Sequence, residues 1–255
     1  MQTWHRIRPL ITLLLASVAV GPAAGSDPQA PKTARDGISL PSFRTISLVI
    51  MTGLPVTAAG DFLHSDPSGW ADLTPRETFQ GWARVTIPSD KPLDPVSQWK
   101  LDKVHGTIVC EGNHGHEWLR YDRELDNFLL HVEWRFEKRE GLTGYNSGVF
   151  VRNNLDGSVW HQAQVGARAY IFGQTLQHGK VSAMIQTPPP PVNPLHPIGE
   201  WNTYEIRCQG PKITLWVNGE LTAEFAVPEV PKGYWGLEAE GYRIEFRNLK
   251  LKTLP

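Results

Sequence analysis

A strict alternation of apolar and polar residues over residues 127–137 constrains the fold more than any other feature of the sequence. The apolar positions are Phe128, Leu130, Val132, Trp134 and Phe136, and they alternate with Leu129, His131, Glu133, Arg135 and Glu137. A period of two over this length indicates a β-strand with one buried and one open face. No window of the chain keeps a 3.6-residue period, so helix is expected to be scarce.

Further strands with turn signals between them follow along the chain. Residues 204–209 alternate, Asn218-Gly219 is a strong hairpin signal between 213–217 and 221–226, and His105-Gly106 predicts a turn between 99–104 and 107–111. The apolar parity of 242–246 slips after Arg247-Asn248, which predicts a bulge. The proline-rich tract 187–197 cannot lie in a central strand and is expected to be a loop. The pattern predicts an all-β fold, a sandwich or jelly roll of antiparallel strands.

The N-terminus has the three-part pattern of a secretory signal. Arg6 and Arg8 precede the apolar residues 10–20, and Ala23-Ala24-Gly25 offers a cleavage site. We therefore expect residues 1–25 to be a signal peptide, 26–59 a linker or N-terminal extension, and 60–255 the folded domain of a secreted or periplasmic protein. The apolar stretch is too short to span a bilayer comfortably, so no membrane span is expected. Residues 44–60 repeat the pattern and leave three alternatives open: an edge strand, a second export-like segment or a misplaced start.

The composition limits the classes of partner that we expect. A formal net charge of −1 gives no electrostatic reason to expect nucleic acid. The 10 Trp residues indicate large core anchors or a surface that stacks on sugar rings. Trp118, Trp160 and Trp216 are the stacking candidates. Cys110 and Cys208 could form a disulfide, but two small buried residues are favoured.

The open faces of the predicted strands gather polar groups at a spacing of two residues, about 7 Å along a strand. These groups are His131, Glu133 and Arg135; Asn146 and Arg152; Gln162 and Gln164; and Glu238 and Glu240. Two carboxylates so placed repel, which raises one pKa and suits acid–base catalysis, although a solvated outer face is the alternative. His114 and His116 could also hold a divalent ion, but a polar hairpin tip is favoured there.

Five motifs in order resemble one family. They are 128–135 (FLLHVEWR), 146–152 (NSGVFVR), 199–206 (GEWNTYEI), 217–219 (VNG), and 236–241 (GLEAEG) with 246–252 (FRNLKLK). Together they are similar to the 3-keto-disaccharide hydrolase domain, formerly a domain of unknown function. The resemblance implies a concanavalin A-like jelly-roll sandwich of two antiparallel sheets. It also implies a carbohydrate substrate, a glycoside oxidised to a ketone at the sugar C3.

The sequence departs from the family at two motifs. The usual Glu-x-Gln is Gln162-Ala163-Gln164, and the usual Leu-Gln-x-His-Gly is Leu237-Glu238-Ala239-Glu240-Gly241. Either the acid–base role has moved to Glu238 and Glu240, or the chain is a non-catalytic carbohydrate-binding module.

The leading hypothesis is a hydrolase or lyase that cleaves 3-keto-glycosides by removing the C2 proton, followed by elimination. In it, Glu240 is the base, and Glu238 raises its pKa or acts as the acid. Arg152 and Gln164 hold the enolate oxygen. The remaining predicted substrate-binding residues are Gln162, Asn146, Glu133, Arg135 and His131. No cofactor is identified, and participation of a divalent metal stays open.

Overall fold

A computed structural model describes residues 60–177, 180–226 and 228–255. The regular elements of these residues are fifteen strands and one helix, α1 (Phe62–Ser65), which has four residues. The predictions for the export signal, the linker and residues 44–59 lie outside the described residues. No described helix has the length and apolar character needed to cross a membrane.

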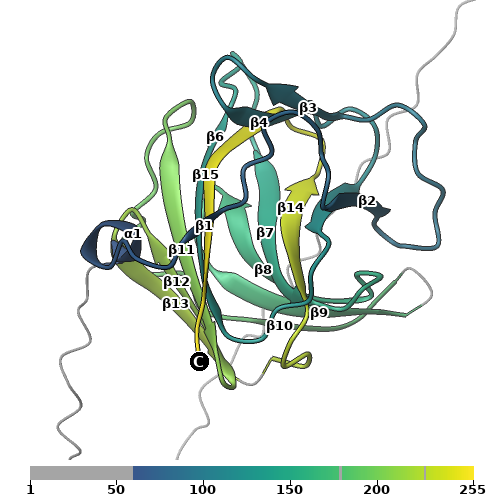
Figure 1. Cartoon of the computed structure of the whole chain (residues 1–255). Coiled ribbons are helices and arrows are strands. Elements are labelled where there is room, and N and C mark those ends of the chain that lie inside the picture. The colour runs from purple at the N-terminus through teal and green to yellow at the C-terminus, as the bar shows by residue number, and fades with distance from the viewer. Residues whose placement is uncertain (1–59, 178–179, 227) are drawn as a thin grey trace, which may run out of the picture. The chain divides into compact units, whose positions relative to one another are not determined.

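The strands form two antiparallel sheets (Figure 1). The first sheet has the order β13-β12-β11-β6-β15-β4-β3, with β1 paired to β15, and its members are β13 (Glu220–Ala226), β12 (Lys212–Val217), β11 (Asn202–Gln209), β6 (Phe128–Phe136), β15 (Ile244–Thr253), β4 (Thr107–Cys110), β3 (Trp99–Asp102) and β1 (Ala71–Asp72). The second sheet has the order β10-β9-β8-β7-β14-β5-β2, and its members are β10 (Lys180–Gln186), β9 (Ile171–Gln177), β8 (Val159–Gly166), β7 (Asn146–Asn153), β14 (Tyr234–Ala239), β5 (Glu117–Tyr121) and β2 (Trp82–Thr86). The predicted all-β sandwich of two antiparallel sheets is confirmed.

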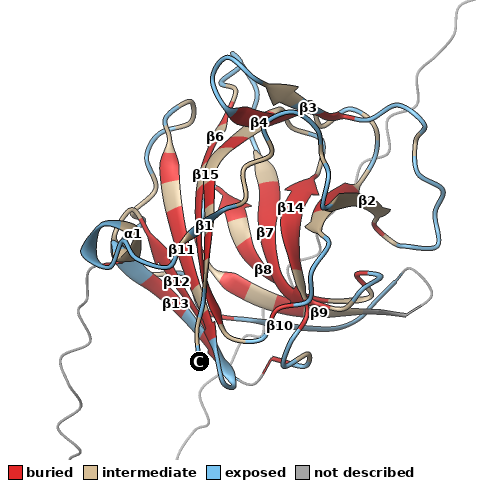
Figure 2. Ribbon diagram, viewed as in Figure 1, coloured by how far each residue is buried: buried red, intermediate tan, exposed pale blue. Residues whose placement is uncertain are grey.

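The core lies between the two sheets and is built by the alternation that the sequence displays (Figure 2). Strand β6 runs between β11 and β15, and Trp134, which is 2% exposed, packs edge-on against Tyr204 at 5.4 Å between ring centroids. The second sheet contributes Val149 and Leu237 to the same cluster. Because these positions have the inward parity, their neighbours in sequence point to the outer faces.

Local turn chemistry also agrees with the sequence. Asn218 and Gly219 both have positive φ (49° and 86°), as a two-residue hairpin turn requires. The predicted bulge lies between Arg247 and Lys250, and Asn248 there has φ 51°. The proline-rich tract follows β10 and contains no strand. Cys110 and Cys208 are buried free thiols, and burial raises the pKa of each to about 12.

The three Trp residues that we expected to stack on sugars are buried. Trp118 and Trp160 pack with Phe150 and Ile87 on the outer side of the second sheet and are 0% and 4% exposed. Trp216, which is 3% exposed, lies against Phe62 of α1, with ring centroids 4.9 Å apart. Parity places these rings on outer faces correctly, but loops and α1 cover the faces at these positions, so the rings stabilise the fold.

Candidate active site

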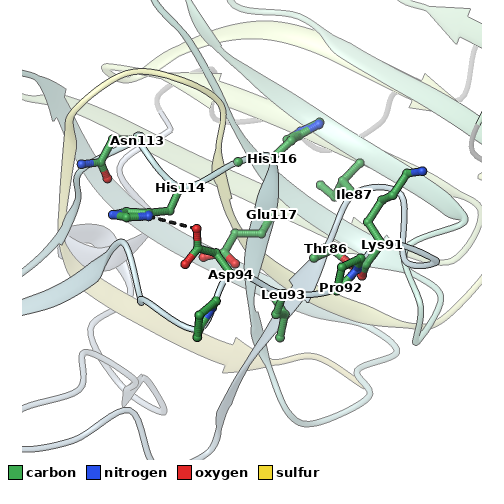
Figure 3. A pocket seen from close by; sticks show the side chains of 12 residues that line it. Thr86, Ile87, Lys91, Pro92, Leu93, Asp94, Asn113, His114, His116 and Glu117 are labelled. Atoms are coloured by element: carbon green, nitrogen blue, oxygen red, sulfur yellow. Dashed lines mark hydrogen bonds and ion pairs between the residues drawn. The ribbon is translucent and has the colours of Figure 1, made fainter.

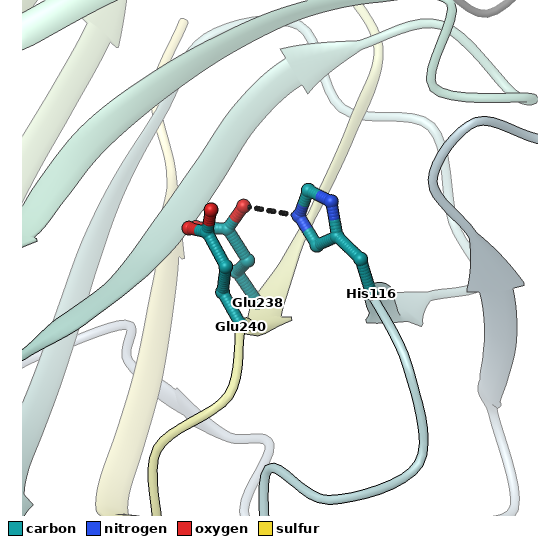
Figure 4. A group of neighbouring side chains, drawn as sticks. All are labelled: His116, Glu238 and Glu240. Atoms are coloured by element: carbon teal, nitrogen blue, oxygen red, sulfur yellow. Dashed lines mark hydrogen bonds and ion pairs between the residues drawn. The ribbon is translucent and has the colours of Figure 1, made fainter. Parts of the chain in front are cut away.

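Two carboxylates and one imidazole meet on the outer face of the second sheet (Figure 4). Glu238 lies on β14 between Leu237 and Ala239, which are both in the core, so its side chain points away from the core. Glu240 follows the end of β14, and His116 comes directly before the neighbouring β5. Ligand atoms of these three residues all lie within 4.8 Å of one another.

Hydrogen bonds extend the cluster across the sheet. Nε2 of His116 is 2.7 Å from Oε1 of Glu238, and Nε2 of Gln162 donates to Oε2 of Glu238 at 2.9 Å. The Gln162 amide also donates to Oε1 of Gln164 at 3.2 Å, and Gln164 donates to Asn146. Asn146 in turn donates to Oε2 of Glu240. The chain of contacts therefore links the two carboxylates through three amide side chains.

Space for this network comes from a glycine on β7. A Cβ on Gly148 would lie 2.3 Å from Nε2 of Gln162, so a larger residue here would displace the amide that holds Glu238. Ser147, next to it, turns inward and donates to the backbone carbonyl of Glu238 at 2.8 Å. The Asn-Ser-Gly motif thus supplies an amide, a backbone anchor and an empty position in three successive residues.

The environment of the cluster raises the pKa of two of its groups, Glu240 and His116. Burial, followed by the charge of Glu238, raises the pKa of Glu240 to about 7. Burial alone would lower the pKa of His116, but its hydrogen bond to Glu238 and the charges of Glu238 and Glu240 raise it overall. The site therefore combines a carboxyl group whose pKa is raised to about 7 with an imidazole whose pKa is raised above its ordinary value.

Arg152 does not join this cluster, contrary to our expectation. It has φ 51° at a register shift between β7 and β14, which breaks the parity that placed it beside Asn146. Its buried guanidinium donates to the backbone carbonyls of Gly210 and Asp126 at 2.6 and 3.3 Å. The prediction that Arg152 holds an enolate oxygen is wrong, and its contacts tie β7 to turns that flank the first sheet.

His131, Glu133 and Arg135 lie on the other sheet, so they cannot share a substrate with Glu238. They project from the outer face of β6. His131 contacts Glu205 at 3.2 Å; burial alone would lower the pKa of His131, but hydrogen bonds to Glu133 and Glu205 and the charges of these two residues raise it overall. Arg247 donates to Glu133 at 2.6 Å. Parity correctly placed these three residues on one face, but it does not say which of two sheets carries the site.

His116 is the cluster member that we did not assign to the site. We considered it with His114 as a metal ligand, but His114 pairs instead with Asp94 at 3.1 Å. The sequence signal for His116 is the alternation of a strand. His116 lies two residues before Trp118 and so has the same parity, and Trp118 is the register partner of Glu238. Pairing β5 with β14 from sequence would have placed His116 and Glu238 together.

The same three residues are close enough to contact a divalent ion. However, both oxygens of Glu238 and one oxygen of Glu240 already accept hydrogen bonds from His116, Gln162 and Asn146. These contacts account for the arrangement of the three side chains.

The jelly-roll sandwich, with a carboxylate and amide cluster on an outer sheet face, fits a carbohydrate-related protein, which is the class that the family comparison gives. The family comparison is more specific, since a model described as "3-keto-alpha-glucoside-1,2-lyase-like domain" matches residues 66–252. The chain belongs to this family. The resemblance found in the sequence motifs is thereby confirmed.

Solved structures support the fold. A candidate glycosyl hydrolase from Parabacteroides distasonis aligns with a TM-score of 0.53 and 18% identity, covering 75% of this chain and 97% of that chain. The carbohydrate-binding module CBM66 from Bacillus subtilis aligns with a TM-score of 0.50 and 15% identity, covering 68% and 96%. A galectin-like protein of unknown function, also from Bacillus subtilis, has a TM-score of 0.50 and 10% identity, covering 72% and 94%.

One relative is a much larger protein. The nonribosomal peptide synthetase ungA of Aspergillus violaceofuscus is 29% identical over 59% of this chain. The match spans 2% of the length of that synthetase.

Proposed function

We propose that this protein cleaves 3-keto-glycosides by removing the proton at C2 of the oxidised sugar and expelling the C1 substituent. The observation that carries the proposal is the His116–Glu238–Glu240 cluster, which combines a carboxylate of pKa about 7 with an imidazole of raised pKa. The family match supports the substrate class.

The chemistry follows from the ketone. A carbonyl at C3 acidifies the C2 proton, because the electrons of the broken C2–H bond delocalise onto the C3 oxygen as an enolate. Reformation of the carbonyl and a new C1–C2 double bond expels the C1 oxygen with its bonding electrons. Water then adds at C1 and a proton returns to C2, so the net outcome is hydrolysis.

Glu240 is the base in this proposal. A general base works best when its pKa is near the operating pH, and the pKa of Glu240 is raised to about 7. One of its oxygens accepts from Asn146, which fixes the carboxylate and leaves the other oxygen for the C2 proton. Burial keeps the pKa of Glu240 high, and like-charge repulsion from Glu238 adds to the effect.

His116 takes the electrostatic role that we first gave to Arg152. As an imidazolium held by Glu238, it places positive charge beside the cluster and can protonate the leaving oxygen. The amide N–H groups of Gln162 and Gln164 already donate to Glu238 and Asn146, so in this proposal the two residues position the acid–base groups rather than hold the enolate oxygen.

A labelling experiment tests both the activity and its mechanism. The purified protein is incubated in D₂O with a 3-keto disaccharide and, separately, with the unoxidised parent. We expect monosaccharide release from the oxidised compound alone, with deuterium at C2 of the 3-keto product beyond that of an enzyme-free control. Release without deuterium at C2 would refute the elimination. No release from any 3-keto glycoside would leave the carbohydrate-binding module as the better interpretation.

A further inference from the structure

A cavity of about 580 Å³ lies beside the cluster and shares His116 with it (Figure 3). Its walls are two segments, 86–95 and 113–117. The volume is in the range typical of small-molecule sites, about 300–1,000 Å³. None of the cluster's interactions described above needs this space, although His116 connects the two directly.

The two walls are fixed to each other before any ligand enters. The backbone N–H of Ile87 donates to the carbonyl of His116 at 2.9 Å, and Asp94 contacts His114 at 3.1 Å. Gln98, which is 0% exposed, donates to the Gly115 carbonyl at 3.0 Å and accepts from the His114 N–H at 3.3 Å. A cavity held open in this way loses little entropy on binding, which favours affinity.

The lining suits a hydroxyl-rich ligand that carries no positive charge. The polar side chains that surround the space include Lys91, Asp94, Asn113 and His114, while Pro92 and Leu93 supply apolar contact. Asp94 is paired with His114, and Glu117 is paired with Arg84 at 2.8 Å, so the acidic groups are compensated. No Phe, Tyr or Trp lines the cavity as described, so a ligand in it is held by hydrogen bonds and aliphatic contacts rather than by stacking.

We propose that this cavity binds the leaving-group sugar, a neutral pyranose attached at C1 of the 3-keto unit. The inference rests on the proposed function and adds a specificity to it. With His116 at the boundary, the bond between C1 and the leaving oxygen lies next to the imidazole, the oxidised ring lies over Glu240 and the amides, and the second ring lies between the two walls. The protein should therefore prefer disaccharides to glycosides with small leaving groups.

The test compares two neutral substrates that share the oxidised ring: a 3-keto disaccharide and the corresponding 3-keto methyl glycoside, whose leaving methanol is too small to fill the cavity. The variants are His114→Ala and Asn113→Ala. The matched control is His105→Ala, which removes an exposed histidine that is paired with Asp102 at 2.7 Å in the same manner, outside the cavity lining. The readout is the ratio of kcat/KM for the two substrates.

We expect the wild type to favour the disaccharide, and each cavity variant to lower the ratio about tenfold, as loss of one or two hydrogen bonds would do. The control should keep the wild-type ratio. If the wild type cleaves both substrates and the cavity variants leave the ratio unchanged, the leaving sugar binds elsewhere and the inference fails while the proposed function stands. If the wild type cleaves neither substrate, the proposed function fails, and the inference fails with it.

Discussion

Replacing Glu240 by Gln should abolish most of the activity and, at alkaline pH, stabilise the protein. The amide keeps an acceptor oxygen for Asn146 but cannot remove a proton, and loss of a positioned general base costs on the order of 10²–10⁴-fold in rate. The stability gain has a separate origin. Burial and the charge of Glu238 make the ionised form of Glu240 unfavourable in the folded state, and the neutral variant avoids that cost.

The sign and size of the gain follow from the pKa. A carboxyl whose pKa is about 7 when folded and 4.5 when unperturbed holds its proton more tightly in the folded state, so stability falls as pH rises from about 4.5 to about 7. At pH 8 the full difference corresponds to about 3 kcal/mol. Glu240 is incompletely buried, and solvent screening reduces this to about 1–2 kcal/mol. In a domain of this size, that is a rise in Tm of roughly 2–8 °C.

Calorimetry at pH 4 and pH 8 separates this electrostatic effect from a packing effect. We expect the variant to melt higher than the wild type at pH 8 and together with it at pH 4, while Glu220→Gln, on the exposed start of β13, matches the wild type at both. Activity on a 3-keto glycoside should fall at least 10²-fold with circular dichroism unchanged. A variant that is destabilised at pH 8, or that keeps full activity, would refute the role of Glu240 and move the search for the base to His116.

Three further predictions test the pH dependence, the core and export. kcat/KM of the wild type should fall as the pH drops below about 7, because the base Glu240 becomes protonated; a flat profile from pH 5 to 8 would contradict this. Trp134→Ala should lower the free energy of unfolding by about 3–5 kcal/mol, and Glu133→Ala by well under that, as measured by denaturant titration; equal losses would contradict the assigned faces. Exported protein should begin between Ala24 and Asp27, and an intact N-terminus on the mature form, found by mass analysis, would overturn the signal peptide.

The fold could be predicted from sequence because its determinants are local. Alternation over residues 128–136 fixes a strand and its buried side, and Asn218-Gly219 fixes a hairpin, since both depend on neighbours in the chain. The bulge at Asn248 was visible for the same reason, as a slip of parity. What local patterns do not determine is which loop covers an outer face, and Trp118 and Trp216 were misjudged for that reason.

The site was only partly predictable because it depends on long-range pairing. Parity gives the face of a strand but not its sheet, so Glu133 and Glu238 were equally eligible for the site until β6 and β14 were assigned to different sheets. Arg152 lies at a bulge in β7. The alternation of apolar and polar residues gives no sign of this bulge, so parity placed Arg152 beside Asn146 incorrectly. His116 lies before the strand that it serves and reaches Glu238 only because β5 pairs with β14.

The pairing also explains how the chain departs from the family motifs at two places at once. The resemblance led us to expect a Glu where Gln162 stands and a Gln where Glu238 stands, and these two side chains are joined by a hydrogen bond of 2.9 Å. Exchanging them keeps one carboxylate and one amide in contact and moves the charge from β8 to β14. At its new position the carboxylate reaches His116, at 2.7 Å, which supplies an imidazole where the motif's own histidine is replaced by Glu240. The two departures therefore keep a carboxylate, an imidazole and the amides in the site and add a second carboxylate, Glu240, and this is why we favour catalysis over binding alone.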